Sequence, residues 1–143
     1  MTKTKERLFY FLPPLIFLTN EAVRTYIRPI YGQKKYGIWS EILGWLPNFL
    51  AGLGIMTLGI GIVLFSQSIS DKAVPKKTKT IILIALTAIA LTGLILHEIT
   101  QKGTNLYYDT QDIFATIAGV FLGVVLYYFM LLRKKLITEK KVL

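Results

Sequence analysis

Residues 42–65 have the sequence ILGWLPNFLAGLGIMTLGIGIVLF, which contains no charged side chain. A helix rises about 1.5 Å per residue, so about 20 apolar residues cross the hydrocarbon core of a bilayer. The apolar residues run continuously and do not alternate with polar ones, which favours a helix over a strand of a membrane barrel. The stretch therefore predicts a transmembrane helix.

Two stretches further along the chain have the same character, Thr80 to Leu96 and Ile113 to Leu132. Of the 143 residues, 53% are hydrophobic, and the mean hydropathy of the chain is positive. That is more apolar surface than a water-soluble fold of this length presents. We therefore expect an integral membrane protein without a soluble globular domain.

The apolar segment near the amino terminus, Leu8 to Leu18, is shorter and contains Pro13 and Pro14. Basic residues precede it, so it is compatible with the hydrophobic region of a signal peptide. The alternative is a retained helix that continues past it, with Arg24 and Arg28 extending toward the lipid headgroups. The residues that follow the segment make a poor cleavage site, which favours the retained helix.

The predicted fold class is an all-α membrane protein, a small antiparallel four-helix transmembrane bundle that forms a single domain over residues 1–143. Short connections imply that consecutive helices are antiparallel neighbours. The helices are expected at approximately residues 8–28, 40–66, 79–100 and 112–133, followed by a basic cytoplasmic tail at 134–143. Four tyrosines are interpreted as aromatic belts at the membrane interfaces: Tyr107, Tyr108, Tyr127 and Tyr128.

The distribution of Lys and Arg predicts the orientation, because cytoplasmic segments carry an excess of positive charge. With four helices and the amino terminus inside, 12 of the 17 basic residues lie in the cytoplasm. These are Lys3, Lys5, Arg7, Lys72, Lys76, Lys77, Lys79, Arg133, Lys134, Lys135, Lys140 and Lys141. The others are Arg24, Arg28, Lys34, Lys35 and Lys102. We therefore expect a multi-pass protein with both termini in the cytoplasm.

The formal net charge of +9 is distributed over short clusters that flank the apolar segments. Such clusters set membrane topology more often than they bind nucleic acid, so the expected partner is the lipid bilayer and no nucleic acid is expected. The chain has no cysteine, which excludes disulfides and thiolate chemistry. No phosphate-binding loop or nucleophile motif is present, and no cofactor is predicted.

Polar residues gather where the last two predicted spans are joined. His97, Glu98 and Gln101 share one turn at the end of the predicted helix 79–100. Asp109 precedes the predicted helix 112–133, and Asp112 begins it. A further amide, one to two turns into the 40–66 helix, is expected on the same side of the membrane. Together they suggest a polar pocket for a ligand, a cation or a proton. The candidate ligand-binding residues are Glu98, Gln101, Asp109, Asp112, Asn48 and His97.

A structural role is the alternative for these side chains. Carboxylates near helix ends are readily solvated and serve as interface anchors. Asp112 can cap the helix that it begins, which is worth about 0.5–2 kcal/mol. Asn48 can make a hydrogen bond between helices, worth about 0.6–2 kcal/mol, instead of contacting a ligand.

The order His97-Glu98-x-x-Gln101 resembles the H-E-x-x-H of zinc proteases, with glutamine in place of the second histidine. The chain contains no other histidine, so the two-imidazole site cannot form and no metal is predicted. An acid and base pair of Glu98 with Asp109 or Asp112 is conceivable, but carboxylates near a polar edge are common. The catalytic residues are unknown, and an enzyme is not the favoured interpretation.

The last predicted helix has a stripe of small residues at helical spacing below Asp112. Thr116, Gly119 and Gly123 follow Asp112 on one face of the helix. The two glycines form a G-x-x-x-G, and Ala115 extends it by one small residue. Such a stripe packs against another helix and does not face lipid. It therefore predicts a helix-packing face and turns Asp112 toward the protein interior.

These residues resemble the VanZ-like family of small bacterial integral membrane proteins. The family has an E-x-x-Q element, then a D-x-x-D helix start and two glycines. The stretch Leu46-Pro47-Asn48-Phe49 also resembles the start of an earlier helix in the family. The matching residues are Glu98 and Gln101, Asp109 and Asp112, and Gly119 and Gly123.

Two positions depart from the family pattern, with Leu106 in place of an arginine and Thr116 in place of an asparagine. Our hypothesis is that Arg24 or Arg28 substitutes for the missing cation. The resemblance implies a bacterial cell-envelope protein of the plasma (inner) membrane. It also implies a family associated with reduced susceptibility to glycopeptide antibiotics such as teicoplanin, but no activity.

The leading functional hypothesis is a VanZ-like protein that binds an envelope component or amphiphile at an outward-facing polar site. One alternative is a small scaffold or accessory subunit of a larger membrane complex. Another is an intramembrane lipid-modifying enzyme that uses Glu98 or Asp112 as acid or base.

Overall fold

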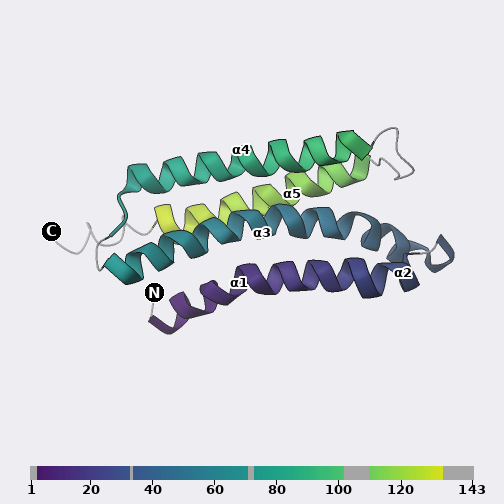
Figure 1. Cartoon of the computed structure of the whole chain (residues 1–143), viewed down its shortest axis with the longest axis horizontal. Helices are drawn as coiled ribbons and strands as arrows, with labels where there is room; N and C mark the ends of the chain where they lie inside the picture. Colours follow the sequence, from purple (N-terminus) through teal and green to yellow (C-terminus); the bar gives the residue numbers. More distant parts are fainter. Residues whose placement is uncertain (1–2, 33, 71–72, 102–109, 134–143) are drawn as a thin grey trace.

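The computed structural model describes residues 3–32, 34–70, 73–101 and 110–133 (Figure 1). Among these residues there is no strand, so the predicted all-α class is confirmed. The first helical stretch comprises α1 (Lys3–Ala22), the π-helical turn η1 (Val23–Ile27) and α2 (Arg28–Tyr31). It is followed by the 3-10 turn η2 (Lys34–Tyr36), α3 (Ile38–Ser70), α4 (Lys76–Gln101), α5 (Thr110–Tyr127) and the π-helical turn η3 (Tyr128–Leu132).

In the described part of the chain, three helices are long and apolar enough to cross a membrane: Ile38–Ser70, Lys76–Thr100 and Thr110–Leu132. They contain the three stretches for which the sequence predicts spans, so these three predictions are confirmed by length and composition. A helix bonds its own backbone N–H and C=O groups, which is what the hydrocarbon core demands. The chain therefore has the helices of a membrane protein.

α3 is the centre of the fold, and its most extensive contact is with α5 (Figure 1). The two helices run parallel, since Phe49 lies against Gly119 and Met56 lies further along against Gly123. A Cβ added at Gly119 would overlap the Phe49 carbonyl group. Lipid is as apolar as the helix surfaces, so close backbone approach of this kind, and not apolar burial, favours their association.

The stripe of small residues on α5 lies in this contact. Ala115, Gly119 and Gly123 are all buried, and a Cβ added at Gly123 would overlap the Met56 side chain. From α3, Gly52 completes the close approach, because a Cβ there would lie 2.8 Å from a backbone oxygen of α5. Both helices thus contribute glycine to one interface.

Tyr127, near the end of α5 remote from Asp112, is fully buried against Ile60 and Val63. Its hydroxyl donates a 2.8 Å hydrogen bond to the carbonyl oxygen of Lys79, in the first turns of α4. The prediction of an aromatic belt is therefore wrong for Tyr127, because the ring fills the core and the backbone satisfies its polar end.

α4 is the most exposed of the three spans. Only 6% of its most apolar window is buried, against 44% for α3 and 39% for α5. Ala90 contacts Met56 on the inside, while Ile81, Ile84 and Ile89 are more than half exposed on the outside. In a bilayer, hydrocarbon covers such a surface.

α1 packs antiparallel to α3, which lies between α1 and α4 in Figure 1. The rings of Tyr10 and Phe65 meet edge to face at 6.5 Å. Further along, the Phe17 ring lies 3.2 Å or less from the position of a Cβ on Gly54. The helical stretch continues without a break through α2, so it includes the predicted segment 8–28. The predicted tail at 134–143 lies outside the described residues.

Candidate functional site

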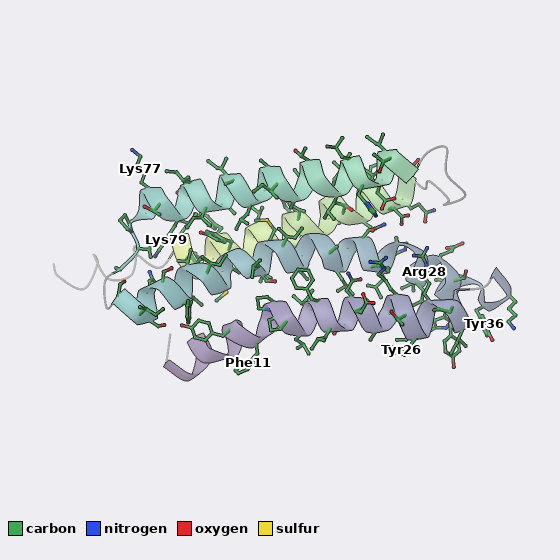
Figure 2. The ribbon with its side chains drawn as sticks, in the orientation of Figure 1. Phe11, Tyr26, Arg28, Tyr36, Lys77 and Lys79 are labelled. Carbon is green, nitrogen blue, oxygen red and sulfur yellow. The ribbon has the colours of Figure 1, made fainter. Side chains whose placement is uncertain are left out.

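Polar side chains from four helices meet at one end of the molecule. α2, the start of α3, the end of α4 and the start of α5 all lie there (Figure 1). In Figure 2, Arg28 lies at this end, whereas Lys77 and Lys79 lie at the opposite end. The predicted site residues that the structure describes are all at the Arg28 end, which we call the polar end.

Glu98 is the centre of the polar end. It lies one turn before the end of α4 and is only 2% exposed. The side-chain amide of Asn48, on α3, donates a hydrogen bond to its carboxylate. The other carboxylate oxygen, Oε2, is buried and has no hydrogen-bond partner. Burying an acceptor without a partner costs about 1–3 kcal/mol, and more when it is charged.

Three further ionisable side chains act on this carboxylate electrostatically. Asp112, in the first turn of α5, has the strongest electrostatic influence on Glu98, followed by His97 and then Arg28. Arg24 is not among the charges that act on Glu98. Of the two arginines that we considered as substitutes for the family cation, the structure thus brings Arg28 to this site.

A π-helical turn determines where Arg28 lies on its helix. The Arg28 N–H bonds to the Val23 carbonyl five residues back, so the turn contains one residue more than an α-helical turn. Pro29 accounts for the wide turn. Proline has no N–H to donate a hydrogen bond to the Thr25 carbonyl, and the proline ring would clash with that carbonyl in an α-helix. Arg28 therefore takes the position that Ile27 would have in an uninterrupted α-helix.

The remaining candidates contribute less to the described site. His97 is exposed and influences Glu98 electrostatically. Gln101 ends α4, but its side chain lies outside the described residues, as does all of Asp109. The described site therefore consists of Glu98 and Asn48 in direct contact, with Asp112 and Arg28 nearby.

Two buried polar side chains were not singled out as site residues. Thr116, one turn along α5 from Asp112, is 1% exposed, and its hydroxyl has no hydrogen-bond partner. On α1, the Asn20 Oδ1 atom is also buried without a partner. Asn20 lies four residues after Ile16 and three before Val23, both buried, and this helical spacing was the signal that could have identified it.

The chemistry that this site supports is hydrogen bonding and charge pairing. Within the described ranges, no group of three or more His, Asp or Glu side chains is arranged to hold a metal ion. What the site offers is an unsatisfied carboxylate oxygen beside a second carboxylate. A hydrogen-bond donor, neutral or cationic, would satisfy it.

Comparison with known proteins gives no further identification, because no protein-family model, no curated protein and no solved structure matches the chain.

Proposed function

We propose that this chain is a VanZ-like protein of the bacterial plasma (inner) membrane that binds an envelope component or amphiphile at its polar end. The single observation that carries the proposal is the Oε2 atom of Glu98, which is buried without a partner. Buried polar atoms in membrane proteins are usually satisfied, and an ionisable residue inside the membrane is usually paired or functional. A ligand that donates a hydrogen bond supplies the missing partner.

The proposal includes four membrane-spanning helices packed as a bundle, with the α1 stretch as the first and both termini in the cytoplasm. The excess of Lys and Arg on the side of Lys77 and Lys79 supports this orientation. In this orientation the polar end faces outward, where an envelope ligand is found. Arg28 belongs to the smaller set of basic residues on the outer side.

The ligand class follows from the site and from the family resemblance together. A ligand with an ammonium, amide or hydroxyl donor matches the acceptor on Glu98 and the nearby Asp112. The family association with reduced susceptibility to glycopeptide antibiotics favours a molecule of the envelope that these antibiotics also contact. We propose such a component, and assign no catalytic step to the site.

Thermal unfolding of the purified protein in detergent tests the proposal. Membrane lipids, peptidoglycan precursors and glycopeptides are each added, and a ligand is expected to raise the melting temperature of the wild type. The rise should be lost in Asp112→Asn and Glu98→Gln. Glu41→Gln is the matched control, because Glu41 is an exposed acid in the first turn of α3 at the same end. If every compound shifts all four proteins alike, the proposal is wrong.

One observation favours a second function, that of an accessory subunit in a larger membrane complex. Phe114 and Phe121 on α5 and Tyr128 at the start of η3 recur every seven residues and are 68%, 67% and 48% exposed. Such a row can pack against a helix of another protein. Purification with a constant partner after mild solubilisation, lost in Phe121→Ala but retained in Ile84→Ala on α4, would favour this function over ligand binding.

A further inference from the structure

A groove of about 400 Å³ lies between α3 and α5 at the polar end. Its volume is within the range of pockets that bind small ligands, about 300–1,000 Å³. Five of its six lining residues are apolar. The lining residues are Trp45, Phe49, Gln111, Phe114, Ala115 and Ala118.

In this groove, aromatic side chains border two alanines. On α3, the rings of Trp45 and Phe49 stand edge to face with centroids 6.5 Å apart. On α5, Phe114 projects outward and is 68% exposed, while Ala115 and Ala118 leave space beside it. From residue 111 to residue 118 the groove follows α5 for about 10 Å.

The polarity of the groove changes along its length. Its one polar lining residue, Gln111, lies in the first turn of α5 and precedes Asp112 of the polar site. Ala118 lies two turns further into the span. Since α5 crosses the membrane, the groove passes from the interface toward the hydrocarbon core. A membrane amphiphile has the same change of polarity along its own length.

We propose that this groove binds one hydrocarbon chain of a membrane amphiphile whose polar head lies beside Gln111 and Asp112. The inference rests on the proposed function and specifies its ligand class, a molecule with a long alkyl or acyl chain. A helix with its side chains is about 10–12 Å wide, whereas the space beside Phe114 is left by two small side chains, Ala115 and Ala118. A flexible chain fits this space and gains apolar contact with three rings.

Fluorescence quenching tests the inference, because Trp45 lines the groove and the chain has only one other tryptophan, Trp39. In Trp39→Phe, Trp45 is the sole emitter. The protein in maltoside micelles is titrated with a phospholipid that carries bromine in the middle of its acyl chains. We expect saturable quenching that the same lipid without bromine reverses. Quenching that rises in proportion to lipid and is not reversed would overturn the inference.

Two variants in the Trp39→Phe background separate the groove from the general lipid surface. Ala118→Phe fills the groove and should raise the half-saturating lipid concentration by about tenfold or more. Ala88→Phe places the same ring on the exposed face of α4 and should leave the half-saturating lipid concentration unchanged. Ala118→Leu, a smaller filling, repeats the test if the phenylalanine variant does not fold. Equal affinities in the groove variants and the α4 control would overturn the inference.

Two further outcomes distinguish the groove from the polar site. If Asp112→Asn leaves lipid binding unchanged while Ala118→Phe abolishes it, the binding of a hydrocarbon chain in the groove stands, whereas the polar head beside Asp112 and the proposed polar site fall. If Asp112→Asn removes the ligand-dependent rise in melting temperature while Ala118→Phe leaves Trp45 quenching unchanged, the proposed function stands and the groove inference falls. A wild-type dimer that Ala118→Phe converts to a monomer would show a second copy in the groove and overturn the inference.

Discussion

Tyr127 and Glu98 are both buried polar side chains, at opposite ends of the three spanning helices. Tyr127 is 0% exposed and Glu98 2%, so water is nearly absent from both. The Tyr127 hydroxyl bonds to the backbone of Lys79, and the surrounding residues are apolar. Glu98 is bonded to Asn48, but its Oε2 is left without a partner, and three ionisable side chains act on it electrostatically.

The difference lies in whether the chain satisfies its own buried polar atoms: it does so for the Tyr127 hydroxyl and does not for Glu98 Oε2. A satisfied hydroxyl ties α5 to α4 and needs nothing else. An unsatisfied carboxylate oxygen beside other charges costs stability, and a fold retains such a cost where another interaction compensates for it. The Tyr127 end can therefore be understood from the chain alone, whereas the Glu98 end retains a buried acceptor that no described residue satisfies.

The largest effect is expected for Gly119→Ala, which disturbs both ends because they share the contact between α3 and α5. The added Cβ overlaps the Phe49 carbonyl, so the helices must separate, and we expect a loss of about 3 kcal/mol in unfolding free energy. Unfolding in detergent mixtures measures it. Gly93→Ala is the control, since its Cβ meets nothing within 4 Å, and it should stabilise α4 by about 0.5–1 kcal/mol. Equal effects of the two substitutions would contradict the described interface.

The next largest effect is expected for Asn48→Ala, which removes the hydrogen-bond partner of Glu98. A loss of about 2 kcal/mol in unfolding free energy is expected, because the carboxylate then has two unsatisfied oxygens. The double variant Asn48→Ala with Glu98→Leu should recover part of the lost unfolding free energy, because it contains no unpaired carboxylate at this position. Additive losses in the double variant would mean that the two side chains do not interact.

A smaller effect is expected for Tyr127→Phe at the opposite end. The ring keeps its packing, and the Lys79 carbonyl loses one bond, so the unfolding free energy should fall by about 1 kcal/mol. Ligand-induced changes in melting temperature should be the same as in the wild type. Altered ligand response in this variant would remove the distinction between the two ends. Tyr128→Phe, on an exposed tyrosine, is the control.

The smallest effect on stability is expected for Glu98→Gln. Glutamine keeps a partner for Asn48 and removes a buried charge, so the unfolding free energy without ligand should change by less than about 1 kcal/mol. The response to ligand should nevertheless be lost. A large destabilisation together with an intact ligand response would assign Glu98 a structural role like that of Tyr127.

The three spanning helices could be predicted because they depend on local composition. A long run of apolar residues has one stable arrangement in hydrocarbon, whatever its neighbours are. The boundaries of α3, α4 and α5 accordingly lie within a few residues of those expected. The two π-helical turns were not predicted, because the position of a widened turn depends on how the helix packs as well as on nearby prolines.

The burial of Glu98 could not be predicted from its position near a helix end. α4 continues only three residues beyond it, which suggests easy access to water. However, α3 begins at Ile38, ten residues before Asn48, and extends about 15 Å beyond the contact with Glu98. α3 therefore covers Glu98, although Glu98 lies near the end of α4. The same dependence on a neighbour explains why Tyr127 was assigned to the interface.

The parallel contact between α3 and α5 also determines when the protein can assemble during its synthesis. Parallel helices cannot follow one another directly, so α4 must return the chain across the membrane between them. The face of α3 that includes Gly52 and Met56 has no α5 to contact until the last span has been synthesised. α3 therefore enters the bilayer with Gly52 and Met56 facing lipid, and the tightest interface of the protein forms last.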